Sequence, residues 1–106
     1  MRELSAVELH ARLAEGLDKP LLLDVREKIE YDYCHIPGSV HIPLNDLPAR
    51  AAELDAAQDI VLICHHGIRS RMAGEFLESL HVKRLLNLTG GVHQWALTVD
   101  HNMPRY

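Results

Sequence analysis

The residues with the clearest chemical potential are a cysteine, Cys64, and the loop that follows it. Cys64 closes an apolar run that begins at Ile60, and three of the run's five residues are β-branched. Such a run predicts a strand that is buried on both faces. Apolar residues then recur at helical spacing from Met72 to Leu80, which predicts an amphipathic helix. Cys64 is therefore expected where a strand ends and a loop leads to the amino end of a helix.

This placement suits a nucleophilic thiol. Free N–H groups and the dipole at a helix start favour negative charge, and a cysteine placed there is deprotonated more readily than usual. Loop amides that point to one centre form an anion-binding nest. Gly67 allows the backbone conformation that such a loop needs, and Arg69 adds a fixed positive charge. The stretch is predicted to bind an anionic sulfur species or an oxyanion.

Length and composition limit the classes of protein. The chain has 106 residues, of which 47% are hydrophobic, and a net charge of −4, so we expect one domain with one core, over residues 1–106. It contains no basic run that would bind nucleic acid and no apolar run of membrane-spanning length. Residues 1–4 lack the apolar core of a signal peptide. We therefore expect a cytoplasmic protein, with its two cysteines free.

Alternating elements must position the loop. Ser5 and Glu8 match a capping box, and Pro48 suits the first turn of a helix. Strands are predicted over residues 21–25, 39–42, 60–64 and 84–88, and helices over residues 6–16, 44–54, 72–80 and 92–97, with a short helix or loop over 26–33. This alternation predicts a mostly parallel sheet with helices on both faces. Ligands bind beyond the carboxyl ends of such strands, which is where Cys64 falls.

Three charged residues are candidates for the surroundings of the thiol. Asp24 and Arg26 lie at the carboxyl end of the strand predicted over residues 21–25. We interpret them as a structural ion pair, with Glu30 as a further partner, and tuning of the thiolate is the alternative. For Arg69, binding of a donor anion and bracing of the loop are both open, and the first is favoured.

The other candidate ligands are histidines and a second cysteine. A metal site would need the rings of His65 and His66 to converge with Cys64, whereas adjacent side chains on a curled loop usually point apart. We therefore predict no metal and no cofactor, and leave open an acid or base role for either histidine. Cys34 is interpreted as a structural thiol. A disulfide with Cys64 would need Cα atoms within about 7 Å.

Taken together, four segments resemble the rhodanese family of sulfurtransferases, in its single-domain form. They are residues 23–27 (LDVRE), 35–43 (HIPGSVHIP), 64–70 (CHHGIRS) and 88–95 (LTGGVHQW). The resemblance implies a three-layer α/β domain with a five-stranded sheet, in which Cys64 carries a persulfide. The substrate-binding residues that it implies are His65, His66, Gly67, Ile68, Arg69 and Ser70.

The implied activity is transfer of sulfane sulfur from thiosulfate or a persulfide donor to a thiol or to cyanide. A sulfur-carrier or desulfurase protein is an implied partner. The alternatives are a non-catalytic partner-binding module of the same fold, a persulfide relay and a phosphatase of related fold. The phosphatase is disfavoured because four residues separate Cys64 from Arg69, where phosphatases resembling this family have five.

Overall fold

The computed structural model describes all 106 residues and is built on a five-stranded sheet. The strand order is β1-β5-β4-β2-β3, and every neighbouring pair is parallel. The strands are β1 (Arg2–Leu4), β2 (Leu21–Asp24), β3 (Val40–His41), β4 (Ile60–Ile63) and β5 (Leu85–Leu88). The predicted α/β class and parallel sheet are confirmed, and β4 lies at the centre of the sheet, so its carboxyl end has a neighbour on each side.

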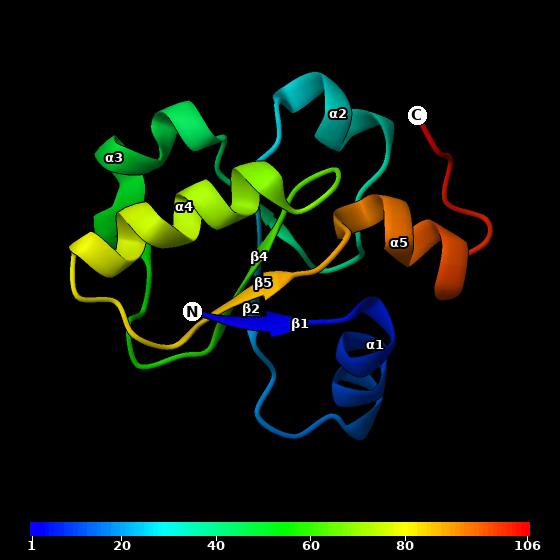
Figure 1. Cartoon of the computed structure of the whole chain (residues 1–106), viewed down its shortest axis with the longest axis horizontal. Coiled ribbons are helices and arrows are strands. Elements are labelled where there is room, and N and C mark those ends of the chain that lie inside the picture. Colours follow the sequence, from blue (N-terminus) through cyan, green and yellow to red (C-terminus); the bar gives the residue numbers. More distant parts are fainter.

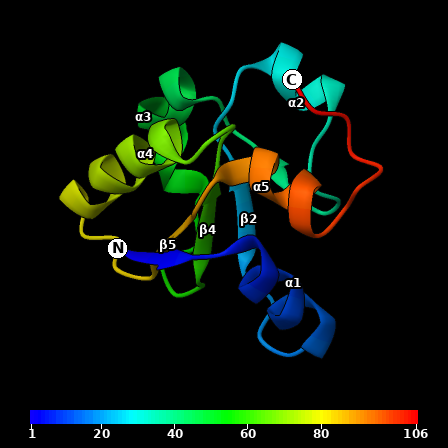
Figure 2. The ribbon, with the colours of Figure 1, turned by 45° about the vertical axis from the view of Figure 1, so that its right-hand side comes forward.

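Helices cover both faces of this sheet. They are α1 (Ala6–Glu15), α2 (Lys28–Tyr33), α3 (Leu47–Arg50), α4 (Ile68–Ser79) and α5 (Gly91–Thr98). The helices α1 and α5 lie on one face and α3 and α4 on the other, which gives the three layers (Figure 1). The carboxyl-terminal residues run back to α2, and Figure 2 shows that end beside this helix. None of the helices combines the length and the apolar character that crossing a bilayer requires.

The helix α1 illustrates how local sequence fixes an element. The Ser5 hydroxyl accepts a hydrogen bond from the Glu8 N–H at 3.1 Å, and the Glu8 carboxylate accepts one from the Ser5 N–H at 2.9 Å. This is the predicted capping box, and it pairs two N–H groups that have no partner within the helix. Gly16 ends the helix with a φ of 71°, a conformation that glycine adopts without strain.

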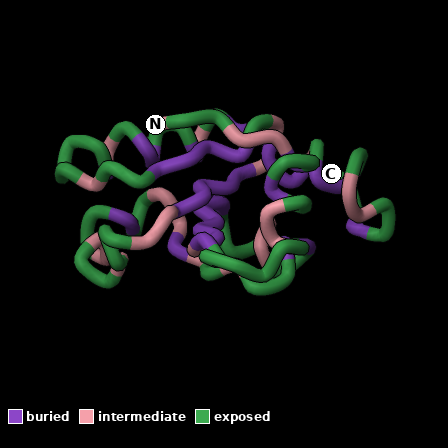
Figure 3. Tube along the Cα trace, turned by 90° about the horizontal axis from the view of Figure 1, so that it is seen from below, coloured by how far each residue is buried: buried purple, intermediate pink, exposed green.

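The core consists of two clusters, one on each face of the sheet. Leu22 and Val61 pack towards α1 and α5, whereas Leu23 and Leu62 pack towards α3 and α4. Successive strand residues point to opposite faces, so a strand covered on both sides must be apolar throughout, as β4 is. Figure 3 shows the buried residues gathered along the strands and the exposed ones along the outer helices and turns.

Two elements differ from prediction. The edge strand β1 was not predicted, because it has three largely exposed residues and forms through pairing with β5, from Arg2 beside Leu86 to Leu4 beside Leu88. Residues 44–54 do not form one helix but a 3₁₀ turn (Leu44–Asp46), α3 and a second 3₁₀ turn (Ala51–Glu53). Pro48 lies in the first turn of α3 as predicted, and its missing N–H rules out the α-helical bond back to residue 44.

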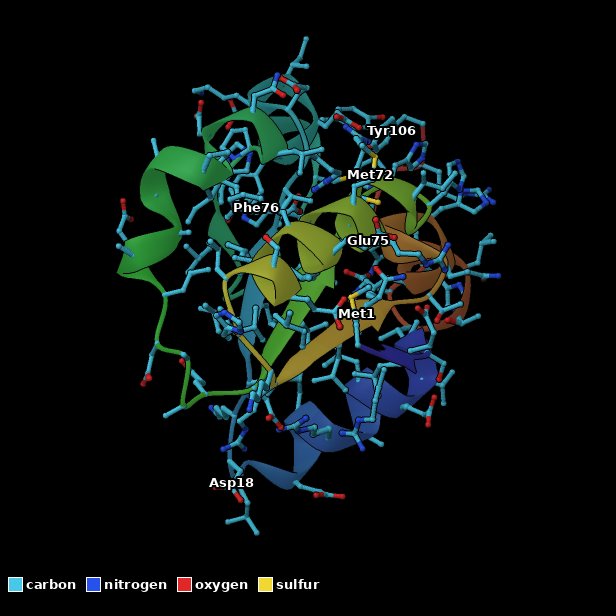
Figure 4. The ribbon with its side chains drawn as sticks, turned by 60° about the vertical axis from the view of Figure 1, so that its left-hand side comes forward. Met1, Asp18, Met72, Glu75, Phe76 and Tyr106 are labelled. Carbon is cyan, nitrogen blue, oxygen red and sulfur yellow. The ribbon has the colours of Figure 1, made fainter.

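The helix α4 packs closely on the amino-terminal residue. In Figure 4, Met1 lies beside this helix, and a Cβ atom added to Gly74 would lie 2.1 Å from the Met1 sulfur. The absence of a side chain at Gly74 therefore leaves room for Met1. Ala73 and Leu77 are buried against the sheet, while Met72 is exposed on the outer side of the helix. These contacts fix the helix that begins at the end of the cysteine loop.

Candidate active site

Cys64 lies at the carboxyl edge of the sheet, directly after β4. The Gly67 N–H donates a hydrogen bond to its Sγ atom at 3.0 Å, and the Ser70 Oγ lies 3.3 Å from the same sulfur. Gly67 has a φ of 102°, so the loop reverses in a conformation that favours glycine. The helix α4 begins at Ile68, four residues before the predicted start at Met72, so Arg69 and Ser70 lie in its first turn rather than in the loop. Cys64 is 1% exposed, so its sulfur lies below the surface among polar groups.

A chain of side chains fixes the direction of the hydrogen bonds at the sulfur. The Asn87 amide nitrogen donates to a Glu3 carboxylate oxygen at 3.0 Å and to the Gly67 carbonyl at 3.3 Å. The Asn87 carbonyl oxygen is therefore the atom that faces Ser70, and the Ser70 hydroxyl donates to it at 2.5 Å. The Ser70 oxygen then has lone pairs free to accept. In this arrangement the thiol of Cys64 donates its S–H to Ser70.

The helix α5 fixes the cysteine loop from the other side. Its Val92 N–H donates to the Cys64 carbonyl at 2.9 Å, and its His93 N–H donates to the His65 carbonyl at 3.1 Å. A Cβ atom at Gly91 would lie 2.2 Å from the Cys64 carbonyl oxygen. This close approach requires glycine at position 91, the first residue of the helix, and the φ of 77° at Gly90 favours glycine there as well.

Arg69 points away from the thiol towards α2. Its two terminal nitrogens donate to the two carboxylate oxygens of Glu30 at 2.6 and 2.8 Å. These bonds from Arg69 lower the pKa of Glu30 to about 2, against the opposing effect of its partial burial. The Tyr106 hydroxyl donates to the same carboxylate at 2.8 Å. Arg69 therefore joins the cysteine loop to α2 and to the carboxyl-terminal segment.

Asp24 and Arg26 form the predicted ion pair at the neighbouring strand. Both side chains are fully buried, and the Arg26 Nη2 atom lies 2.7 Å from an Asp24 carboxylate oxygen. Although burial acts in the opposite direction, Asp24 raises the pKa of Arg26. Arg26 also donates to the Cys34 carbonyl at 2.6 Å and to the Tyr106 hydroxyl at 2.8 Å. Arg26 also donates to the Glu30 main-chain carbonyl at 3.4 Å, and through Tyr106 the pair connects to the Glu30 carboxylate, so the predicted network with Glu30 is present.

The rings of His65 and His66 converge, with centroids 4.0 Å apart. The expectation that they point apart is therefore wrong. His93 lies beside both, with ring centroids 5.9 Å from His65 and 4.9 Å from His66. Tyr106 stacks on His65 with centroids 3.9 Å apart. Burial lowers the pKa of His65, and the neighbouring His66 lowers it further.

The predicted site residues thus separate into groups. Cys64, Gly67 and Ser70 meet at the sulfur, Arg69 pairs with Glu30, and the two loop histidines face α5. The Ile68 side chain is exposed. Cys34 and Cys64 are both free and belong to different core clusters.

Sequence reasoning missed three residues around the loop. Asn87 carried a signal, since it is the one polar residue within the apolar strand 85–88. The signal at His93 was weaker, and consisted only of its position in the first turn of the helix that follows Gly90. Tyr106 carried none, because residues 98–106 have no period. It helps line an apolar surface hollow of about 320 Å³, together with Ile29, Glu30 and Tyr33.

Comparisons with known proteins show which family the chain resembles. The family described as "Rhodanese-like domain" matches residues 5–98. The chain is 34% identical over 104 residues to a "Sulfurtransferase" of Allochromatium vinosum, covering 98% of this chain and 94% of that protein. It is 45% identical over 75 residues to the "Putative sulfur carrier protein YrkF" of Bacillus subtilis, covering 71% of this chain but 40% of that longer protein.

The same likeness appears among solved structures. The crystal structure of a rhodanese-like domain protein from Staphylococcus aureus superposes with a TM-score of 0.85 at 25% identity. The superposition covers 100% of this chain and 99% of that one. The agreement extends over the whole sheet and its helices.

Proposed function

Since the chain belongs to the rhodanese-like domain family, we propose that it is a sulfurtransferase whose Cys64 carries the transferred sulfur as a persulfide. The donor is thiosulfate or another sulfane-sulfur compound, and the acceptor is a thiol or, in an assay, cyanide. The observation that most supports this proposal is the pair of polar contacts to Sγ, from the Gly67 N–H at 3.0 Å and the Ser70 hydroxyl at 3.3 Å.

These contacts prepare the sulfur for a change of charge. Once the S–H proton has left to water, the Gly67 N–H still donates to the thiolate. The Ser70 hydroxyl can then turn from Asn87 towards the sulfur. The Gly67 N–H is already oriented, so it can stabilise a developing anion without reorganisation, and a donor of this kind is worth roughly 3 kcal/mol in comparable oxyanion sites.

The first step loads the cysteine. The Cys64 thiolate attacks the outer sulfur of thiosulfate, a new S–S bond forms, and the S–S bond of thiosulfate breaks. Sulfite leaves with the bonding electron pair, so a thiolate and thiosulfate become an enzyme persulfide and sulfite. This is nucleophilic catalysis, which divides one transfer into two easier steps.

The second step unloads it. Cyanide or a thiolate attacks the terminal sulfur, the persulfide S–S bond breaks, and Cys64 is released as thiolate with thiocyanate or a new persulfide as product. Arg69 braces the loop during both steps rather than binding the donor, because its guanidinium is already held by both carboxylate oxygens of Glu30.

Intact mass spectrometry after incubation with thiosulfate tests the proposal. We expect the mass to rise by one sulfur atom and to return to its first value after cyanide treatment. Cys64→Ala should prevent the gain, while Cys34→Ala, the matched control at the other cysteine, should leave it intact. A gain that persists in Cys64→Ala would contradict the assignment.

A second candidate is a persulfide relay, in which Cys64 accepts sulfur from a desulfurase and passes it to a carrier protein. The similarity to a protein named as a putative sulfur carrier favours it. Both functions use the same thiol, so they differ in the donor. A relay should be loaded faster by a cysteine desulfurase with cysteine than by thiosulfate, and the opposite order would favour the thiosulfate enzyme. Loading by neither would leave a partner-binding module.

A further inference from the structure

Three histidines from two elements meet beside the sulfur site. We propose that His65, His66 and His93 form a binding site for a divalent transition-metal ion, with zinc as the ion that its ligands suit. His65 and His66 belong to the cysteine loop, and His93 lies in the first turn of α5. This site is distinct from the proposed persulfide chemistry, because it uses none of the groups that contact Cys64 Sγ.

The ligand geometry is close to what a metal ion needs. One ring nitrogen from each histidine lies within 4.8 Å of the other two. Zinc bonds to imidazole at roughly 2.0–2.1 Å, which places tetrahedral ligand nitrogens about 3.4 Å apart. Rotations of the three rings supply the remaining approach. Imidazole is a good ligand for zinc, copper and nickel, and three of them leave a fourth position for water.

Main-chain hydrogen bonds hold the cysteine loop against the start of α5. The His93 N–H donates to the His65 carbonyl at 3.1 Å, and the adjacent Val92 N–H donates to the Cys64 carbonyl at 2.9 Å. Gly91 permits the close approach of the two segments. The backbone of His93 therefore stands opposite the loop because main-chain bonds place it there.

Two unsatisfied atoms point to a ligand. His65 Nε2 and His93 Nδ1 are both inaccessible to solvent and have no hydrogen-bond partner. Buried polar atoms without partners are rare in folded proteins, and each calls for an explanation. A metal ion between the rings would bind lone pairs of these nitrogens. His66 is exposed, so the third ligand gives the ion a route from solvent.

Zinc binding to the Cys64→Ala protein tests the site without interference from that thiol. Competition with a chromophoric chelator should give one zinc ion per chain. His93→Asn should weaken the affinity at least tenfold, and zinc should raise the thermal midpoint of the parent but not of this variant. The matched control is His81→Asn, at an exposed histidine with a φ of 66° that asparagine tolerates, and it should bind as the parent does.

A second variant keeps the test decisive if His93→Asn fails to fold. His66→Asn changes an exposed ring, so it should keep the fold and still weaken zinc at least tenfold. The proposal is overturned if the parent binds no stoichiometric zinc, or if either folded variant binds zinc as tightly as His81→Asn. Because all of these proteins lack the Cys64 thiol, the result is independent of whether the persulfide proposal holds.

Discussion

The two cysteines are similar in burial and differ in the polar groups that contact their sulfur atoms. Cys34 is 8% exposed and Cys64 is 1% exposed, and each belongs to an apolar core cluster. At Cys34 the backbone carbonyl, not the thiol, accepts the bond from Arg26. The sulfur of Cys64 accepts the Gly67 N–H and contacts Ser70. Burial alone therefore does not separate a reactive thiol from a structural one, whereas polar groups directed at the sulfur do.

The largest expected effect comes from exchanging each sulfur for oxygen. Cys64→Ser should lower the rate of thiosulfate–cyanide sulfur transfer by at least about 10³-fold, because it removes the nucleophile. Cys34→Ser should leave the rate within about twofold, since Cys34 supplies packing. Steady-state thiocyanate formation measures both. Equal losses in the two variants would erase the distinction between the cysteines.

The next largest effect concerns the buried ion pair of Asp24 and Arg26, which also bonds to the Cys34 carbonyl. Asp24→Asn should lower the free energy of unfolding by about 3 kcal/mol, because it leaves the buried Arg26 without its counter-charge. Urea denaturation gives the value. Asp32→Asn, which removes an exposed pair with Lys28, is the control and should change stability little. If the two variants unfold alike, the buried pair has no special part in anchoring this region.

Ser70→Ala sharpens the comparison at the sulfur itself. It removes the hydroxyl next to Sγ and leaves the Asn87 carbonyl oxygen without its donor. We expect the loading rate to fall about tenfold, or about 1.4 kcal/mol in activation free energy. Single-turnover loading by thiosulfate measures it. Ser79→Ala, on an exposed turn of the same helix, is the control. An unchanged loading rate would leave Gly67 as the sole contributor.

The smallest expected effect is on the free energy of unfolding at acid pH. The pKa of Glu30 is lowered from 4.5 to about 2 by its bonds from Arg69, so its contribution is complete above pH 4.5 and is lost as the pH falls towards 2. Glu30→Gln should lower stability at pH 7 by about 1 kcal/mol, after solvent screening. It should also flatten the decline below pH 4.5. Glu15→Gln, at an exposed position, should keep the parental slope in thermal scans.

The elements that sequence analysis placed correctly are those whose signals are local. The capping box at Ser5 and the apolar run ending at Cys64 each act within a few residues, so the pattern is sufficient. The edge strand β1 has no such signal, because its three residues become a strand only when β5 is beside them. Residues 44–54 carry a helical pattern, but Pro48 interrupts their hydrogen bonding.

The site was predictable where one segment builds it and not where several converge. Cys64, Gly67 and Ser70 come from one segment, the cysteine loop and the first turn of α4, and their meeting follows from spacing. The direction of Arg69 towards Glu30, and the convergence of His93 with the loop histidines, depend on how α2 and α5 pack. Side-chain direction across a packed interface is a tertiary property, so residue spacing in one segment cannot reveal it.

The main-chain bonds from Val92 and His93 to the cysteine loop have a consequence for biosynthesis. Translation proceeds from the amino terminus, so Cys64 emerges from the ribosome well before Gly91 does. Until the later segment arrives and docks, nothing holds the loop carbonyls, and the neighbourhood of the thiol is incomplete. The loop around Cys64 therefore acquires its full set of main-chain contacts only after residues 91–93 have been made.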